Sequence, residues 1–200
     1  MNKRKRFSSF NLRDALALTQ VQTVHPWVMD APSKLPSNHY QQTMDKLNQH
    51  FDLSLSESAK VLWIDMILLE ALNAFDGLKI WKEASLQTQQ LTGVVDYLIA
   101  PQAVVYQQPL LCVVEAKKDN FEKGMAQCLV EMYACQQLNQ QDFAVYGIVT
   151  NAVNWEFYKL SASQQLYKTV AYSEAHLEEI LGILNWIFAQ CLENQSQIKT

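Results

Sequence analysis

The sequence contains few cysteines, and their spacing matches neither a disulfide framework nor a zinc site. All four lie in apolar segments, and none forms a Cys-x-x-Cys pair. Apolar surroundings of this kind are typical of buried free thiols in a reducing compartment. The four histidines are scattered, without the spacing of metal ligands. We therefore expect a cytoplasmic protein without disulfides or structural zinc. The cysteines are Cys112, Cys128, Cys135 and Cys191.

The sequence also lacks an uninterrupted apolar run long enough to cross a membrane. The richest run, residues 61–72, is interrupted by Asp65 and Glu70, and a spanning helix needs about 20 predominantly apolar residues. The basic start at residues 3–6 is followed by polar residues rather than by the apolar core of a secretion signal. We expect no membrane association and no secretion.

Charged residues are scarce, at 18% of the chain, and the formal net charge is -4. A module that binds duplex DNA through a strongly basic surface is therefore not indicated. An enzyme whose positive charge is local, or comes from a bound metal, remains compatible with this balance. Hydrophobic residues make up 49% of the 200 residues, which is enough for the core of one compact domain. Within it, residues 1–54 are expected to form a basic arm and helical cover, and residues 55–200 the core.

The hydrophobic pattern predicts helices and strands in an order that is typical of α/β proteins. This order predicts a central mixed β-sheet flanked by helices on both faces. An irregular connection is expected around Pro26, Pro32 and Pro36. Helices are predicted over residues 11–19, 37–50, 54–75, 121–140 and 173–193, and strands over residues 78–88, 93–99, 110–117, 143–150, 155–160 and 166–172.

The N-terminal segment and the third helix each carry charges of interest. Residues 1–10 are predicted to form a loose basic arm, either simply solvated or in contact with phosphate. The third helix begins with a capping box of Ser54 and Glu57. Asp65 and Glu70 lie about 140° apart around that helix, so we expect one of them to point inward and the other to reach solvent.

Two apolar strands carry charge where a buried strand should not. Asp96 lies within Gly93–Ile99, and Glu115 and Lys117 end the next strand. Residues two apart on a strand point to the same face, so Glu115 and Lys117 should project together. Two carboxylates, with the carbonyl of Ala116, can hold Mg²⁺ beside a phosphate. A solvated charge pair at a strand end, with Asp96 as a turn or cap residue, is the ordinary alternative, and such a short motif is common by chance.

The ordered set of motifs resembles the PD-(D/E)XK nuclease superfamily, whose members have the restriction-endonuclease-like fold. The motifs are Glu70, Gly93-Val-Val-Asp96, Glu115-Ala-Lys117 and Gln127. The pattern is similar to the N-terminal nuclease domain of type I restriction enzyme motor subunits, over roughly residues 55–160. The resemblance implies a three-layer α/β fold.

The resemblance also implies a role for each site residue. Asp96 and Glu115 would bind the metal directly, with the Ala116 carbonyl as a further ligand. Glu70 would reach the metal from its helix, often through water. Lys117 would be the catalytic lysine, and Gln127 would orient the site or touch the substrate backbone.

Two positions depart from the family pattern. Val95 stands where the nominal motif has proline, which is frequent in the superfamily. Glu131 stands four residues after Gln127, where related nucleases often have tyrosine, and Tyr133 follows two residues later. Gln127 is thus the least secure of the assignments, and Glu131 can share its helix face. Glu83, on the preceding strand, is a further acidic candidate, although an ordinary strand residue is the more common explanation.

The function predicted from these residues is metal-dependent hydrolysis of phosphodiester bonds, with DNA as the expected substrate. Mg²⁺ would be the cofactor, and Mn²⁺ should be able to substitute. A homodimer is expected because duplex cleavage needs two strand cuts, and a protein partner could supply specificity. The alternative is a catalytically silent nuclease-fold module that binds nucleic acid or a protein partner in a defence or repair assembly.

Overall fold

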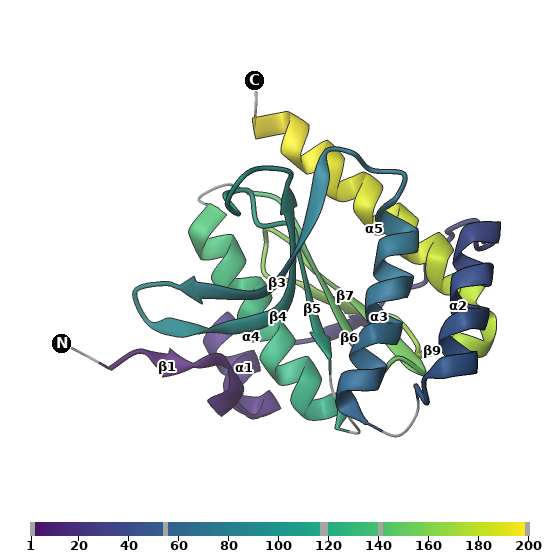
Figure 1. Cartoon of the computed structure of the whole chain (residues 1–200). Coiled ribbons are helices and arrows are strands. Elements are labelled where there is room, and N and C mark those ends of the chain that lie inside the picture. Colours follow the sequence, from purple (N-terminus) through teal and green to yellow (C-terminus); the bar gives the residue numbers. More distant parts are fainter. Residues whose placement is uncertain (1–2, 54–55, 117–119, 140–141, 199–200) are drawn as a thin grey trace.

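A computed structural model describes residues 3–53, 56–116, 120–139 and 142–198. The chain folds as a mixed β-sheet flanked by helices (Figure 1). The helices are α1 (Leu12–Thr19), α2 (Asn38–His50), α3 (Glu57–Leu72), α4 (Phe121–Asn139) and α5 (Leu177–Ile198), with short 3-10 turns at Phe7–Ser9 and Glu174–His176. The strands are β1 (Lys5–Arg6), β2 (Val24–Pro26), β3 (Leu78–Gln87), β4 (Leu91–Pro101), β5 (Cys112–Ala116), β6 (Val145–Thr150), β7 (Asn154–Leu160), β8 (Leu166–Lys168) and β9 (Tyr172–Ser173).

The strands described form one sheet in the order β1-β4-β5-β6-β7-β8-β2, with β3 on β4 and β9 on β7. Strands β3, β4 and β5 run antiparallel, β5 and β6 are parallel, and β6, β7 and β8 are antiparallel again. The parallel pair is joined through α4, as a parallel connection requires a crossover. This confirms the predicted mixed α/β architecture.

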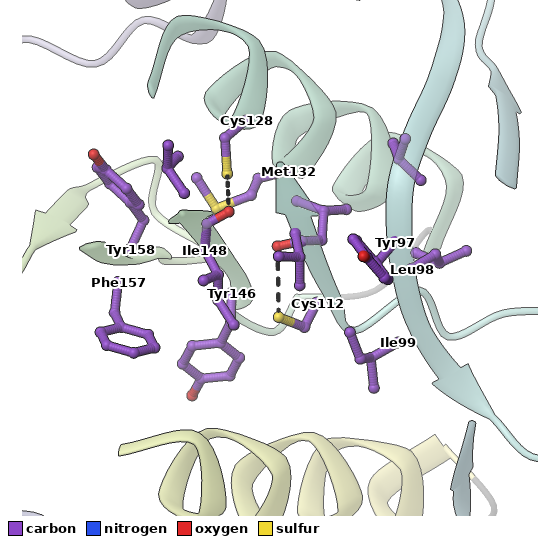
Figure 2. Close-up of a cluster of buried hydrophobic side chains, with 14 of the residues drawn as sticks. Tyr97, Leu98, Ile99, Cys112, Cys128, Met132, Tyr146, Ile148, Phe157 and Tyr158 are labelled. Atoms are coloured by element: carbon purple, nitrogen blue, oxygen red, sulfur yellow. Dashed lines mark hydrogen bonds between the residues drawn. The ribbon is translucent and has the colours of Figure 1, made fainter. Parts of the chain in front are cut away.

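Neighbouring residues of β6 show that helices cover both faces of the sheet. A Cβ on Gly147 would lie 2.6 Å from Cys128 and Met132 of α4, whereas the Tyr146 ring packs edge-on against Trp186 of α5. Figure 2 shows Cys128 and Met132 beside Ile148, with the Tyr146 ring on the side of the sheet facing α5. Helix α1 packs on α4, and α3 packs beside α5. The absence of a side chain at Gly147 is what lets α4 approach the sheet so closely.

The N-terminal segment is part of the sheet, so the prediction of a loose arm was wrong. Lys5 and Arg6 pair in parallel with Leu91 and Thr92 of β4. The segment is anchored by Phe7, which is buried against Gly93, where any Cβ would lie 2.3 Å from its ring. The basic side chains remain exposed. The apolar residues behind the basic run thus fix it beside β4.

Several predicted boundaries differ from those in the structure. Helix α3 is capped by Ser56, whose hydroxyl accepts from the amide of Ala59, and not by Ser54, which lies outside the described residues. Short strands β2 and β9 were not predicted; β2 pairs in parallel with β8. Among the described residues, none of the helices is long and apolar enough to cross a membrane.

Candidate functional site

The candidate site lies where the β4–β5 ladder ends. The last pair of that ladder is Tyr97 with Val114, and the next residues of the two strands are Asp96 and Glu115, which do not form a ladder pair. The amide of Ala116 donates a hydrogen bond of 2.8 Å to Oδ2 of Asp96. This bond replaces a backbone pair with a side chain, and it holds the Asp96 carboxylate at the carboxyl end of β5.

Glu115 lies completely inside the protein, with no exposed surface. The three residues before it in β5, Cys112, Val113 and Val114, are buried and apolar or thiol-bearing. A carboxylate in such surroundings is costly unless it is paired with hydrogen-bond donors or a cation. A partner for Glu115 is therefore a requirement of the fold, and α4 supplies one.

Gln127 of α4 joins two carboxyl groups through its side-chain amide. Nε2 donates to Oε2 of Glu115 at 2.8 Å and to Oε1 of Glu131 at 2.9 Å. Gln127 and Glu131 are one turn apart, so they share a helix face. The structure thus brings Gln127, which the resemblance placed at the site, to Glu115 and adds Glu131, which the sequence indicated only by its spacing from Gln127.

The electrostatic environment of Glu131 favours its neutral form. Complete burial raises the pKa of Glu131 well above that of an ordinary glutamate, and the nearby Glu115 carboxyl raises it further. The hydrogen bond from Gln127 opposes this shift. Two carboxyl groups in contact in an apolar interior are not readily both ionised. Burial and Glu115 thus both favour the protonated form of Glu131 in the carboxylate cluster of Asp96, Glu115, Gln127 and Glu131.

The donor chemistry of the site fits a hard divalent cation. Asp96, Glu115 and the carbonyl of Ala116 offer oxygen atoms, which are the ligands that Mg²⁺ prefers. The buried side-chain oxygen of Gln127 has no hydrogen-bond partner among the described residues and adds an acceptor nearby. Within the described ranges no three His, Cys, Asp or Glu side chains form a group that could hold a metal. A cation here would therefore take further ligands from the main chain, water and substrate.

Lys117, the predicted catalytic lysine, lies outside the described residues. It directly follows Ala116, the residue whose amide bonds Asp96. Lys118 and Asp119 are outside them as well.

Glu70 does not join this cluster, so its predicted role at the metal was wrong. Its two carboxylate oxygens accept hydrogen bonds from the amide and hydroxyl of Ser37, at 2.7 and 2.9 Å. Ser37 is the N-cap of α2. The Tyr97 hydroxyl contacts α3 at Val61, nine residues before Glu70, which is about 13 Å along a helix. Glu70 therefore supports the start of α2 instead.

Asp65, the other carboxylate of α3, also has a structural partner. Its oxygens lie 2.7 and 2.9 Å from Nζ of Lys82 on β3. The expectation that either Asp65 or Glu70 points inward was wrong, since both are bound to partners near the surface.

Glu83 stands opposite Asp96 in the register of the β3–β4 ladder, but the ladder is interrupted there. Pairs are formed at Lys82 with Tyr97 and at Ala84 with Val95, and not between. Glu83 has a φ of 52° and is exposed. A non-glycine residue in this left-handed region is strained. The irregularity lies directly beside the candidate site.

No family model matches the chain, and no curated protein matches it.

Proposed function

We propose that this chain is a divalent-metal-dependent nuclease of the restriction-endonuclease-like type that hydrolyses phosphodiester bonds in DNA. The observation that carries the proposal is the hydrogen bond from the Ala116 amide to Asp96, which holds the Asp96 carboxylate beside the end of β5, where Gln127 binds Glu115. The two carboxylates lie far apart in the sequence and close together in the fold. Lys117 follows them immediately in the chain.

Each residue has a distinct part in the proposed reaction. Asp96, Glu115 and the Ala116 carbonyl would hold Mg²⁺ or Mn²⁺, which when bound polarises a phosphate and lowers the pKa of a water molecule. Gln127 orients the Glu115 carboxylate through its amide. Lys117 would orient the attacking water or offset the charge that develops on the phosphate.

Cleavage of a duplex requires a cut in each strand. One such site per chain therefore favours a homodimer, and a further protein partner would supply sequence specificity. Both remain proposals that a measurement of the oligomeric state on DNA would test.

The alternative is a silent nuclease-fold module that binds nucleic acid or a protein partner. The observation that favours it is the complete burial of Glu115, whose Oε2 is already bonded to Gln127. A cation would have to reach this carboxylate from the solvent side of Asp96. In a silent module the cluster would serve only to hold α4 on the sheet.

Nicking of supercoiled plasmid separates the two functions. We expect the wild-type protein to nick with Mg²⁺ and not with EDTA. Lys117→Ala should lose turnover and keep its fold, whereas Asp45→Asn, an exposed position on α2, should nick as wild type does. A folded wild-type protein that binds DNA without nicking it would support the silent module.

A further inference from the structure

A polar cavity of about 580 Å³ lies beside the N-terminal strand, and none of the residues of the carboxylate cluster lines it. It is formed by the turn between β3 and β4, the end of α4 and the residue before β1. None of the described residues that line it is acidic. Its polar side chains are Arg4, Thr88 and five glutamines, Gln87, Gln89, Gln90, Gln108 and Gln137.

Arg4 is held in place at this cavity. Its Nε donates a 2.8 Å hydrogen bond to the carbonyl of Thr88, and the next residue, Lys5, bonds the carbonyl of Gln90 through its amide. The Thr88 hydroxyl in turn accepts from the amides of Gln90 and Leu91, which fixes the turn. In the described part of the chain, the bond to Thr88 is the one hydrogen bond of the Arg4 side chain. The donors on its terminal nitrogens are therefore oriented and available.

We propose that this cavity binds a phosphate of the nucleic-acid backbone, with Arg4 as its principal ligand. A guanidinium fixed through Nε presents its remaining N–H groups in a planar fork that matches two phosphate oxygens. Glutamine amides are further phosphate donors. Lys3 and Arg6, exposed on either side of Arg4 and Lys5, add positive charge to a chain whose net charge is -4.

The distance from the cavity to the carboxylate cluster is similar whether it is measured along β4 or along α4. Along β4, Leu91 to Asp96 is five residues, or about 17 Å. Along α4, Gln137 lines the cavity and Gln127 bonds Glu115, a separation of ten residues or about 15 Å. A duplex rises about 3.4 Å per base pair, so one that contacts both points extends about five base pairs from the cut. A substrate that contacts both the cavity and the carboxylate cluster must therefore be longer than a dinucleotide.

This inference rests on the proposed function for the identity of its ligand, and its test is independent of catalysis. Fluorescence anisotropy of a labelled DNA duplex in EDTA, over a series of salt concentrations, compares the wild type with Arg4→Gln. We expect weaker binding and a slope of log K against log salt that is lower by about one. Arg13→Gln is the matched control, since Arg13 is exposed on α1 and does not line the cavity. Arg4→Lys should recover part of the salt slope, and melting temperatures verify the folding of each variant.

Three outcomes decide the assignment. Wild-type binding by Arg4→Gln, or an equal loss in Arg13→Gln, overturns it even if the protein nicks DNA. A duplex that extends fewer than about five base pairs from the cut should bind independently of Arg4, and continued dependence on Arg4 would contradict the distance argument. If DNA binding depends on Arg4 but the wild-type protein does not nick DNA, the phosphate site is supported and only the proposed nuclease activity is contradicted.

Discussion

Glu131 of α4 and Glu70 of α3 are both glutamates on helices that flank the sheet, and the structure gives them opposite settings. Glu131 has no exposed surface and reaches Glu115 through the amide of Gln127. Glu70 is half-buried and accepts two hydrogen bonds from Ser37. Glu131 thus lies in an apolar interior beside another acid, whereas Glu70 binds the N-cap residue of a neighbouring helix.

The difference shows how to separate a structural carboxylate from a functional one. Glu70 stabilises the start of α2 near solvent, where an ionised carboxylate costs little free energy. Two carboxyl groups that meet inside a core raise the free energy of the folded state unless a proton or a cation offsets their repulsion. The setting of Asp96, Glu115, Gln127 and Glu131 is therefore the one that the proposed metal site would explain, whereas the setting of Glu70 is explained by Ser37 alone.

Charge-neutral replacements of the site carboxylates and of Glu70 test this comparison most directly. Asp96→Asn and Glu115→Gln should each lower metal-dependent nicking on the order of 100-fold or more, because each removes a negative metal ligand while keeping its shape. Glu70→Gln should leave the nicking rate unchanged. An equal loss of activity in Glu70→Gln would show that α3 does contribute to the site.

Gln127 tests whether the α4 side of the cluster orients the metal ligand. Gln127→Ala should weaken metal affinity by about 10- to 100-fold, because the Glu115 carboxylate loses the amide that fixes it. Gln127→Glu should be worse, since it replaces a hydrogen-bond donor with a fourth acid. Titration calorimetry measures both, and unchanged affinity in Gln127→Ala would mean that Glu115 is oriented without it.

Glu70 should matter to stability alone. Glu70→Ala removes both acceptors of Ser37 and should lower the free energy of unfolding by about 1 kcal/mol. Urea denaturation provides the measurement, with Asp45→Ala on the exposed face of α2 as the control. No loss of stability would mean that water replaces the carboxylate at this helix start.

Glu131 should make stability depend on pH when no metal is bound. Its pKa is raised in the folded state, mainly by burial and then by Glu115. Its contribution is therefore fully present below the unfolded pKa, about 4.3, and is lost as the pH rises through the folded pKa. In EDTA, the melting temperature of Glu131→Gln relative to the wild type should rise across this window. Parallel pH profiles of the two proteins would contradict a shifted Glu131.

Much of the fold could be predicted from local patterns in the sequence. Strands β3 to β7 and helix α4 were found because their apolar runs are long and bounded by turn residues. Strands β2 and β9 were missed because each has three residues or fewer and depends on pairing with distant segments. Strand β1 was predicted as part of a loose basic arm because the four charges of residues 3–6 hide the anchoring role of Phe7, which depends on the bare backbone of Gly93.

Some residues of the candidate site could also be predicted from the sequence, and others could not. Asp96 and Glu115 were predicted to meet because each places a charge in one of two neighbouring apolar strands, where an unpaired charge is costly. Gln127 was named from the resemblance, and its spacing from Glu131 gave the shared helix face. Glu70 was misplaced because an acid in an apolar helix can serve another helix, and its partner Ser37 lies 33 positions earlier. Arg4 was missed because its anchor, the carbonyl of Thr88, carries no signal in the sequence.

The most direct test of the central claim is calorimetric titration of Mn²⁺ into the wild-type protein, the Asp96→Asn/Glu115→Gln double variant and Glu70→Gln. We predict that the wild type and Glu70→Gln bind the metal with similar affinity and that the double variant does not bind it. Equal binding by the folded double variant, or no binding by the wild type, would contradict a metal centre at the end of the β4–β5 ladder.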